Sequence, residues 1–504
     1  MIIKEITSKD WVWFWSGNWP LLDCIYQRDP LFQEEFRMIM GDYPRVSLDI
    51  YKDGVLTAYH TSGEYSRLGR LFLEVFSKRP SFIQESFRCY GKRTRKDITR
   101  LARISGLDLK TLTNSRLAEL FRFTRALFRF NSTYDHYCWY LEKFLHPVLQ
   151  RFLERRIGDK SRMHEYLAAL VTPHKGSRVY QERCAFFSMV RSLKGDRSVV
   201  DCIKRDDDLH GKFPYAARMI EDHARKYGYL VVLVNNPPLS YDDVIKEVRK
   251  YVLDNKSFTI DSVRIGDSYD PGARRRSEKI IRMISPPKKI RLLIQGLRET
   301  SFIRTEDNAV MSLSSYLIAP LFEEIAVRLG ITYHDLKFLV PEEIICLLRY
   351  HQKADMSRIN DRKTLCVHYV DEKDNYLFTG KNARAVCNAL HSRPCKASEL
   401  KGTPASSGKT VGTAFVAKSS VHETKLFREG DILVAPATSA DFVPIMRKAS
   451  AVVTEMGGLT SHAAIVSREF RVPCVVGVSG ATSSIMTGDI IEVDAGSGMI
   501  RKIK

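Results

Sequence analysis

The sequence has 504 residues, of which 44% are hydrophobic and 27% are charged. This length predicts roughly three domains, and the composition excludes an intrinsically disordered or a fibrous chain. No apolar run approaches the ~18–20 residues that span a bilayer. The N-terminal segment Met1–Glu5 lacks the basic flank and long apolar stretch of a signal peptide. The sequence therefore predicts a soluble, cytoplasmic protein that does not enter a membrane.

The net charge is +20, and it is unevenly distributed along the chain. Residues 401–504 contribute +3, whereas the first 400 residues contribute +17. The densest basic stretch, Pro271–Glu306, holds ten basic and three acidic residues. Such a stretch fits a solvated surface, a site for an anionic ligand or a docking face for an acidic partner. The sequence has no zinc finger, no RRM motif and no aromatics interleaved with Lys and Arg, which argues against nucleic acid as a partner.

Ten cysteines are scattered from Cys24 to Cys474, and none of them form a Cys-x-x-Cys pair. In a long chain without a secretion signal, this spacing predicts reduced and mostly buried thiols. A zinc site would need ligands that converge from distant segments, so we expect no metal centre.

The first 160 residues combine a small amount of strand with a long helical region. Alternate tryptophans from Trp11 to Trp15 share one face if that segment is extended. Ser47–Tyr51 and Val55–Tyr59 flank an Asp-Gly turn, which predicts a hairpin. From Tyr65 to about Arg156 the apolar residues recur at helical spacing. We interpret the aromatic residues in this stretch as core residues.

The next 230 residues are mainly helical in pattern. The apolar run Tyr229–Val234 predicts a buried strand, and Ile290–Leu329 predicts a long helix that ends at Gly330. A second hairpin is predicted from Leu365–Tyr369 and Tyr376–Phe378. These patterns place a hairpin and helices in residues 1–100 and a mainly helical domain in residues 101–391.

The segment 392–407 contains Pro and Gly, and we interpret it as an interdomain linker. The pattern of apolar and polar residues changes after this segment. Residues 408–504 alternate short strands with helices and predict a compact α/β domain. The predicted strands are Val411–Ala417, Asp431–Ala435, Ala451–Thr454, Cys474–Gly477, Asp489–Asp494 and Met499–Ile503, and the predicted helices are Asp441–Lys448 and Ser461–Phe470. The expected fold class is thus multidomain α+β.

The chemistry is concentrated in the string Thr454–Glu469, which predicts a strand end, a glycine turn and a helix start. Gly457 and Gly458 let the backbone approach an anion closely. The helix that opens with Thr460, Ser461 and His462 would offer free N–H groups and a positive dipole end to phosphate. The same dipole disfavours imidazolium, so the ring of His462 stays neutral and can act as a nucleophile.

This string resembles a known family. Residues Gly402–Lys504 are similar to the phosphohistidine swivelling domain of phosphoenolpyruvate-utilising enzymes, which include phosphoenolpyruvate synthase, pyruvate phosphate dikinase and rifampicin phosphotransferase. The resemblance implies that residues 408–504 form a swivelling β/β/α domain in which His462 is phosphorylated. It further implies that the Thr460 hydroxyl orients the ring and that Ser461, Gly457 and Gly458 bind phosphate. Arg468 is a further candidate for contact with phosphate.

A weaker resemblance covers part of the central region. The fragments His223–Gly228, Arg298-Glu299 and Asp335–Glu343 are similar to pieces of the helical acceptor-binding domain of rifampicin phosphotransferase. The central region would then belong to a phosphoenolpyruvate synthase-like protein that lacks an ATP-grasp domain. Neither the glycine-rich and paired motifs of an ATP-grasp domain nor a phosphoenolpyruvate-binding barrel is recognisable in this sequence.

The resemblance therefore implies the phosphohistidine component of a split phosphotransferase. A separate ATP-grasp protein, similar to the N-terminal part of phosphoenolpyruvate synthase, would use ATP and Mg²⁺ to charge His462. The chain would carry the phosphoryl group to an acceptor that the sequence does not identify. Two alternatives stay open. The first is a complete phosphoenolpyruvate synthase-like or antibiotic-phosphorylating enzyme with an unrecognised ATP site, and the second is a non-catalytic regulator that is recognised through its phosphohistidine.

Overall fold

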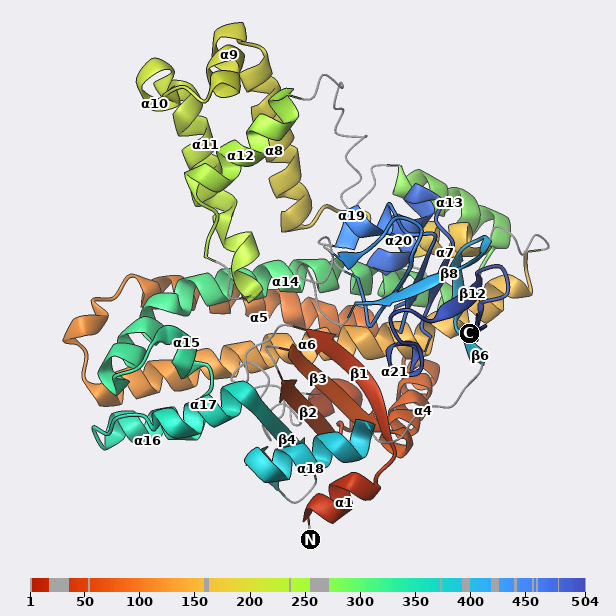
Figure 1. The fold of residues 1–504 in the computed structure, drawn as a ribbon, viewed down its shortest axis with the longest axis horizontal. Coiled ribbons are helices and arrows are strands. Elements are labelled where there is room, and N and C mark those ends of the chain that lie inside the picture. Colours follow the sequence, from red (N-terminus) through yellow and green to blue (C-terminus); the bar gives the residue numbers. More distant parts are fainter. Residues whose placement is uncertain are drawn as a thin grey trace.

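The computed structural model shows two β-sheets joined by a large group of helices (Figure 1). It describes residues 2–17, 36–52, 55–157, 163–234, 237–253, 272–371, 374–391, 399–417, 426–438, 442–455, 457–458, 461–478 and 480–503. Helices dominate the first 391 residues, and strands dominate the C-terminal part. The multidomain α+β fold class predicted from the sequence is confirmed.

Two long antiparallel helices, α6 and α14, form the centre of the helical part (Figure 1). The ring of Phe121 packs on Phe322 at one end of the pair, and Arg304 bonds to Glu142 toward the other. The helices of this part are α4 Ser62–Lys78, α5 Phe82–Ser105, α6 Asn114–Glu154, α7 Met163–Val171, α13 Ala273–Ile284, α14 Lys288–Leu329, α15 Tyr333–Leu336, α16 Pro341–Arg349 and α17 Met356–Thr364, with a 3-10 turn η1 at Leu109–Thr111. The predicted long helices are confirmed.

Helix α14 contains a window that is long and apolar enough to cross a membrane by length and composition alone. Half of that window is buried inside the structure, where α14 packs against α5, α6 and α7. Burial against neighbouring helices is typical of a helix in the core of a protein. The helix ends at Gly330, whose φ of +71° is a conformation that favours glycine.

A five-stranded antiparallel sheet combines strands from both ends of the helical part. Its order is β1-β3-β2-β4-β5, with β1 Trp11–Gly17, β2 Ser47–Lys52, β3 Val55–Thr61, β4 Leu365–Val370 and β5 Asn375–Thr379. Both predicted hairpins are present. The structure differs from the predicted division at residue 100, because β2 pairs directly with β4. Residues 101–364 thus lie between two halves of one sheet, and hydrophobic periodicity does not show which strands pair.

Helices α1 Ile2–Ser8 and α18 Gly380–His391 pack on one face of this sheet. Apolar side chains from α1, α18 and the strands share a buried cluster. The other face of the sheet points toward α6, because Tyr51 and Leu56 share a second cluster with the N-terminal half of that helix. Cys366 on β4 belongs to this second cluster.

The segment Tyr229–Val234 is not a strand, as the sequence predicts, but part of the 3-10 helix η3 Gly228–Val234. It packs against α14 and α11. A short apolar run has the same pattern in a buried strand and in a buried helical turn, so periodicity alone cannot separate the two.

Helices α8 to α12 form an arm that projects from the body of the molecule (Figure 1). The arm has its own apolar cluster, to which α8, α9, α11 and α12 contribute. Its helices are α8 Arg178–Lys194, α9 Arg197–Arg205, α10 Leu209–Lys212, α11 Pro214–Tyr227 and α12 Tyr241–Leu253.

The C-terminal domain is an eight-stranded sheet in the order β6-β13-β12-β8-β9-β10-β11-β7. Strands β8 to β11 run parallel, as expected where strands alternate with helices. The elements are β6 Glu399–Lys401, β7 Thr403–Ser406, β8 Lys409–Val416, β9 Ile432–Ala435, α19 Val443–Met446, β10 Ala451–Thr454, α20 His462–Phe470, β11 Cys474–Val476, α21 Ala481–Ser484, β12 Ile490–Asp494 and β13 Met499–Lys502. The predicted alternation of strands and helices is confirmed.

The predicted linker 392–407 needs a correction. Residues 399–406 are strands β6 and β7, which pair with β13 and β11. Pro404 and nearby small residues suggested a linker, but Pro404 lies in an outer strand of the sheet, where proline is tolerated. Residues 392–398 lie outside the described residues.

The C-terminal domain rests on the helical part. Buried apolar side chains of both form one continuous cluster, with Leu167 and Ile284 on the helical side and Phe442 and Ala464 on the other. Figure 1 shows α19 and α20 beside α7 and α13. In this structure, the C-terminal domain is thus docked on the helical part.

Candidate functional site

The candidate site lies at the edge of the C-terminal sheet where the parallel strands β9 and β10 end. The backbone N–H of Glu455, the residue after β10, donates to Ala435 O at 3.1 Å. The N–H of Val478 donates to Thr454 O at 2.9 Å, so the chain after β11 passes the same point. Loops that follow neighbouring parallel strands meet at one edge, and ligand sites in α/β sheets commonly lie there.

Gly457 has a steric reason to be glycine. Its φ is +103°, and a Cβ at this position would lie 2.6 Å from both Cβ and Oγ of Ser461. Gly458 has no positive φ, and a Cβ there would meet no atom within 4 Å. The first glycine therefore closes the turn tightly against Ser461, while the second leaves open space beside the backbone.

Ser461 begins the helix that carries His462. Its N–H donates to Gly458 O at 3.0 Å, and its Oγ accepts the N–H of Ala464 at 3.3 Å. The Ser461 side chain is thus an N-cap of α20. His462 is the first residue of α20, so its backbone lies in the first helical turn, as the sequence predicts.

The remaining predicted site residues are only partly described. Thr460 lies outside the described residues, and so do the side chains of His462 and Arg468. The phosphorylation of His462, the orienting role of Thr460 and the phosphate contacts of Ser461 and Arg468 stay predictions.

Glu455 also lies at this site, and its role is not evident from the motif. Its Oε1 accepts two hydrogen bonds from Thr482, from the backbone N–H at 2.6 Å and from Oγ1 at 2.8 Å. Burial raises the pKa of Glu455, and the Thr482 bonds oppose that rise. In the sequence, Glu455 is recognisable as an acidic residue that lies between an apolar strand and a pair of glycines.

The site is close to the five-stranded sheet. Burial, together with the negative charges of Cys387 and Glu455, raises the pKa of Tyr59 to about 12. Tyr59 lies in β3 of the five-stranded sheet, whereas Glu455 follows β10 of the C-terminal sheet.

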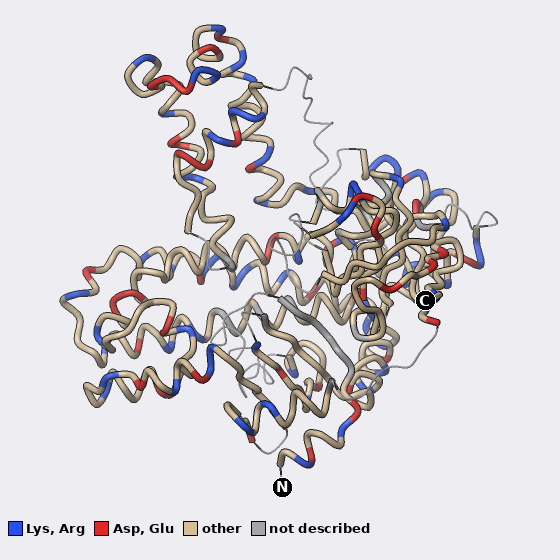
Figure 2. The backbone as a smooth tube through the Cα atoms, viewed as in Figure 1, with Lys and Arg blue, Asp and Glu red and all other residues tan. Residues whose placement is uncertain are grey.

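The basic stretch Pro271–Glu306 is described from Gly272 onward. Arg274, Arg275 and Arg276 are exposed at the start of α13. In Figure 2, basic positions along the backbone gather in this region, beside the C-terminal domain. Arg298 is instead half-buried and donates two hydrogen bonds to Leu170 O, at 3.2 and 3.0 Å. The stretch thus combines an exposed basic surface with a residue that stabilises the end of α7.

The three fragments that resemble an acceptor-binding domain have local structural contacts. His223 in the arm pairs with Glu182 at 3.0 Å. Asp335 forms a capping box with Thr332. Glu343 pairs with Arg362 at 2.6 Å. These contacts lie in different elements, and they stabilise the fold where they occur.

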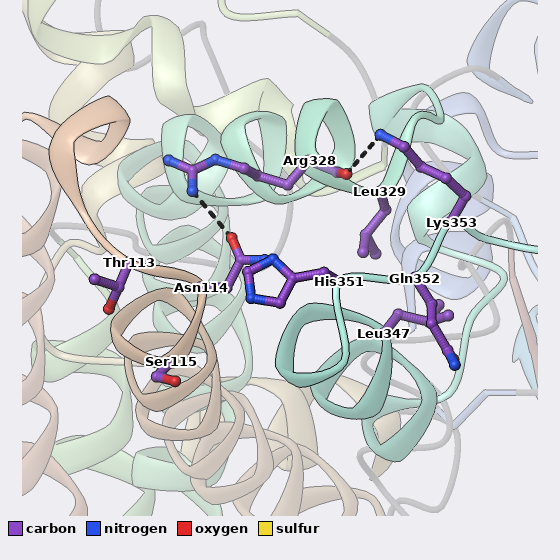
Figure 3. A pocket seen from close by; sticks show the side chains of 9 residues that line it. All are labelled: Thr113, Asn114, Ser115, Arg328, Leu329, Leu347, His351, Gln352 and Lys353. Atoms are coloured by element: carbon purple, nitrogen blue, oxygen red, sulfur yellow. Dashed lines mark hydrogen bonds between the residues drawn. The ribbon is translucent and has the colours of Figure 1, made fainter.

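A cavity of about 520 Å³ lies at the start of α6 (Figure 3). Arg328 donates to Asn114 Oδ1 at 2.9 Å there, and Lys353 donates to Arg328 O at 3.0 Å. These basic side chains bond to the protein itself, and none of the predicted site residues lines the cavity. Within the described ranges, no group of three or more His, Cys, Asp or Glu side chains could hold a metal ion.

Comparison with known proteins matches this site to a family. Residues 427–498 match the model "PEP-utilising enzyme, mobile domain". A phosphoenolpyruvate synthase from Pyrococcus furiosus is 48% identical over 103 residues, which cover 20% of this chain and 12% of that protein. A pyruvate kinase from Lactobacillus delbrueckii subsp. bulgaricus is 44% identical over 100 residues, which cover 20% of this chain and 17% of that protein.

A crystal structure of Thermococcus kodakaraensis aconitase X aligns with 21% of this chain and 98% of its own, at 21% identity and a TM-score of 0.18. The similarity to the curated relatives is confined to about a fifth of this chain and spans less than a fifth of each relative. The segment 427–498 includes the glycine turn and the start of α20. Residues 427–498 are thus similar to the mobile domain of phosphoenolpyruvate-utilising enzymes, and this similarity concerns that part of the chain alone.

Proposed function

We propose that the chain is the phosphohistidine component of a phosphotransferase. A separate ATP-grasp protein, acting in the cytoplasm with ATP and Mg²⁺, phosphorylates His462, and the mobile domain delivers the phosphoryl group to an acceptor. The observation that supports this proposal best is the position of His462. It begins α20 directly after a tight glycine turn, inside a segment that matches the mobile domain.

The local geometry supports a phosphoryl-carrying role. The start of α20 presents backbone N–H groups and the positive end of the helix dipole, which stabilise phosphate. The Ser461 cap holds the first turn in place. Because phosphoryl transfer depends on positioning and on charge neutralisation, a fixed helix start beside an open glycine suits it.

A carrier must also move between a donor and an acceptor. The mobile domain is attached to α18 through residues 392–398 and is docked on the helical part through apolar contacts. We infer that these contacts break when the domain turns toward the ATP-grasp partner, as in other rigid-body domain motions. The exposed arginines of α13 lie next to the docked domain and offer a basic surface to that partner.

The test is a labelling experiment on the full chain. Labelled ATP is added to the purified protein alone and together with a candidate ATP-grasp protein. We expect acid-labile, alkali-stable label only in the mixture and none in His462→Ala. Label in the absence of a partner would favour a complete enzyme, and label that survives hot acid would contradict phosphohistidine.

The role of Thr460 is tested in the same assay. Thr460→Val keeps the branched shape and removes the hydroxyl, so we expect the transfer rate to fall roughly 5- to 150-fold if the hydroxyl orients the ring. An unchanged rate would assign Thr460 a purely structural role.

A further inference from the structure

The cavity at the start of α6 has no part in the proposed function, and we call it the α6 cavity. Its volume of about 520 Å³ lies within the ~300–1,000 Å³ range of small-molecule sites. Three parts of the chain meet there: the first turn of α6, the last turn of α14, and the end of α16 with the residues that follow it (Figure 3). Nine described residues line the cavity, and Leu329 and Leu347 are the two apolar ones.

Backbone hydrogen bonds fix the walls of the α6 cavity. The N–H of Gln352 donates to Leu347 O at 2.9 Å, and the N–H of Ala354 donates to Leu329 O at 3.2 Å. The segment after α16 is thus bonded to α16 and to α14. A Cβ on Gly330 would lie 3.1 Å from Lys353 Cδ, so the glycine lets the Lys353 side chain pass over the end of α14. The cavity is therefore formed by the fold itself.

The hydrogen bonds of Asn114 determine which nitrogen of His351 carries the proton. Arg328 can only donate, so its 2.9 Å bond identifies Asn114 Oδ1 as the acceptor. Asn114 Nδ2 then donates to Leu348 O at 3.0 Å and to His351 Nδ1 at 3.2 Å. Because Nδ1 accepts, the neutral ring carries its proton on Nε2. His351 therefore offers an N–H donor at the cavity.

Two further lining residues have donors that are not used within the protein. Lys353 Nζ has three N–H groups and donates to Arg328 O at 3.0 Å. Ser115 is exposed, and within the described ranges its hydroxyl has no hydrogen-bond partner. Open donors thus come from α6 on one side of the cavity and from the segment after α16 on the other.

The charge of the lining narrows the class of ligand. It contains Arg328 and Lys353 but no Asp or Glu. The charge of Arg328 is balanced by Glu324, which accepts from its Nε at 2.7 Å. Lys353 has no carboxylate partner among the described residues. A positive charge among hydrogen-bond donors binds an anion more strongly than a neutral molecule.

The number of donors favours phosphate over carboxylate as the anionic group. His351, Lys353 and Ser115 offer three separate donor groups, and a phosphate monoester has three terminal oxygens to accept from them. A carboxylate has only two oxygens. The volume exceeds the need of a lone inorganic ion, and Leu329 and Leu347 offer apolar surface to the remainder of a larger molecule.

The α6 cavity is remote from the candidate site at α20. Helix α6 has 41 residues, which corresponds to a length of about 60 Å. The cavity lies at its start, whereas the C-terminal domain shares an apolar cluster with Leu145 and Leu149 in its second half. A ligand in the cavity is therefore separate from the group that His462 would carry.

We propose that the α6 cavity binds a small phosphorylated molecule. Lys353, His351 and Ser115 bond to its phosphate, and the rest of the molecule lies against Leu329 and Leu347. Binding involves no covalent step and no phosphorylation of His462, so this inference does not depend on the proposed function.

The experiment is a calorimetric titration of the full chain with AMP, glucose 6-phosphate, citrate, adenosine or glucose. We expect AMP or glucose 6-phosphate to bind with a Kd below about 1 mM and at least tenfold more tightly than its neutral counterpart. Binding of neither phosphorylated compound would overturn the inference. Equal binding of the neutral compounds, or tighter binding of citrate than of both phosphorylated compounds, would overturn it as well.

Two variants and a matched control assign the binding to the cavity. Lys353→Met keeps most of the side-chain length and removes the charge, so we expect the affinity to fall about tenfold or more. Ser115→Ala should lower it about threefold. Lys110→Met is the control, because Lys110 is exposed beside the cavity, where its carbonyl accepts from Arg328, but does not line it. We expect this control to change the affinity less than about twofold.

Thermal unfolding of every variant verifies the fold, since Lys353 also bonds to the end of α14. If Lys353→Met does not fold, Ser115→Ala carries the test against Lys110→Met. Equal losses of affinity in the cavity variants and in Lys110→Met would indicate general charge attraction and overturn the inference. Unchanged affinity in Ser115→Ala and in folded Lys353→Met would place the ligand elsewhere and overturn it too.

Discussion

Glu455 in the mobile domain is electrostatically coupled to Tyr59 in the five-stranded sheet, because its charge contributes to the raised pKa of Tyr59. The two residues belong to different sheets and are separated by almost 400 positions in the chain. This coupling links the C-terminal domain to the helical part of the molecule.

The first prediction concerns the pH dependence of stability. Burial raises the pKa of Glu455 above its ordinary value of 4.5, so the folded state binds the proton more tightly than the unfolded state. The stability associated with this proton is complete below pH 4.5 and is lost as pH rises through the raised pKa. We expect the Tm of the native protein, relative to Glu455→Gln, to fall as pH rises from 4 to 7. A constant difference would contradict a buried, protonatable Glu455.

The second prediction compares the two glycines of the turn. Gly457→Ala introduces a Cβ at a φ of +103° and into contact with Ser461. We expect a loss of about 1–3 kcal/mol in the free energy of unfolding of the mobile domain. Gly458→Ala is the control, since its Cβ would meet open space, and we expect a change within about 1 kcal/mol. Equal effects in calorimetric unfolding would show that Gly457 has no special steric role.

The third prediction concerns the cap of α20. Ser461→Ala removes the acceptor of the Ala464 N–H, which we expect to cost about 1 kcal/mol. Ser461→Thr retains the hydroxyl and should recover most of that stability. Hydrogen exchange at the N–H of Ala464 measures the effect directly, and exchange as slow in the alanine variant as in the native protein would exclude the cap.

The fourth prediction tests a buried ion pair in the helical part. Arg362 is buried and donates to both carboxylate oxygens of Glu343, at 2.6 and 2.8 Å. Arg362→Met should cost about 3 kcal/mol, because it leaves Glu343 without its buried partner. Arg358→Met removes the exposed partner of the same carboxylate and should cost about 1 kcal/mol or less. Denaturant unfolding that ranks the two variants in the opposite order would contradict this assignment.

The sequence predicted the individual helices and strands better than it predicted which strands pair with each other. Long helices such as α6 and α14, and the hairpin strands, were recognisable because their periodicity is local. The pairing of β2 with β4 was not recognisable, because strand pairing across the helical part leaves no local pattern. The run Tyr229–Val234 was assigned wrongly, since its apolar residues suit either a strand or a 3-10 turn.

The sequence predicted those parts of the candidate site that lie within its continuous motif. The glycine turn and the helix start at His462 lie within one continuous string, and the family resemblance applies to the same string. Glu455 and Thr482 are separated by 26 residues, and only the fold brings them into contact.

The pairing of β2 with β4 has a consequence for the order in which the protein can assemble. Strands β1 to β3 leave the ribosome early, but β2 has an unpaired edge until β4 has been synthesised more than 300 residues later. An exposed strand edge can pair with other chains, so the nascent N-terminal hairpin is at risk of aggregation during that interval. Helix α18 follows β5 and precedes the C-terminal domain in the chain. The segment to which that domain is attached is thus synthesised only after all five strands of the sheet are present.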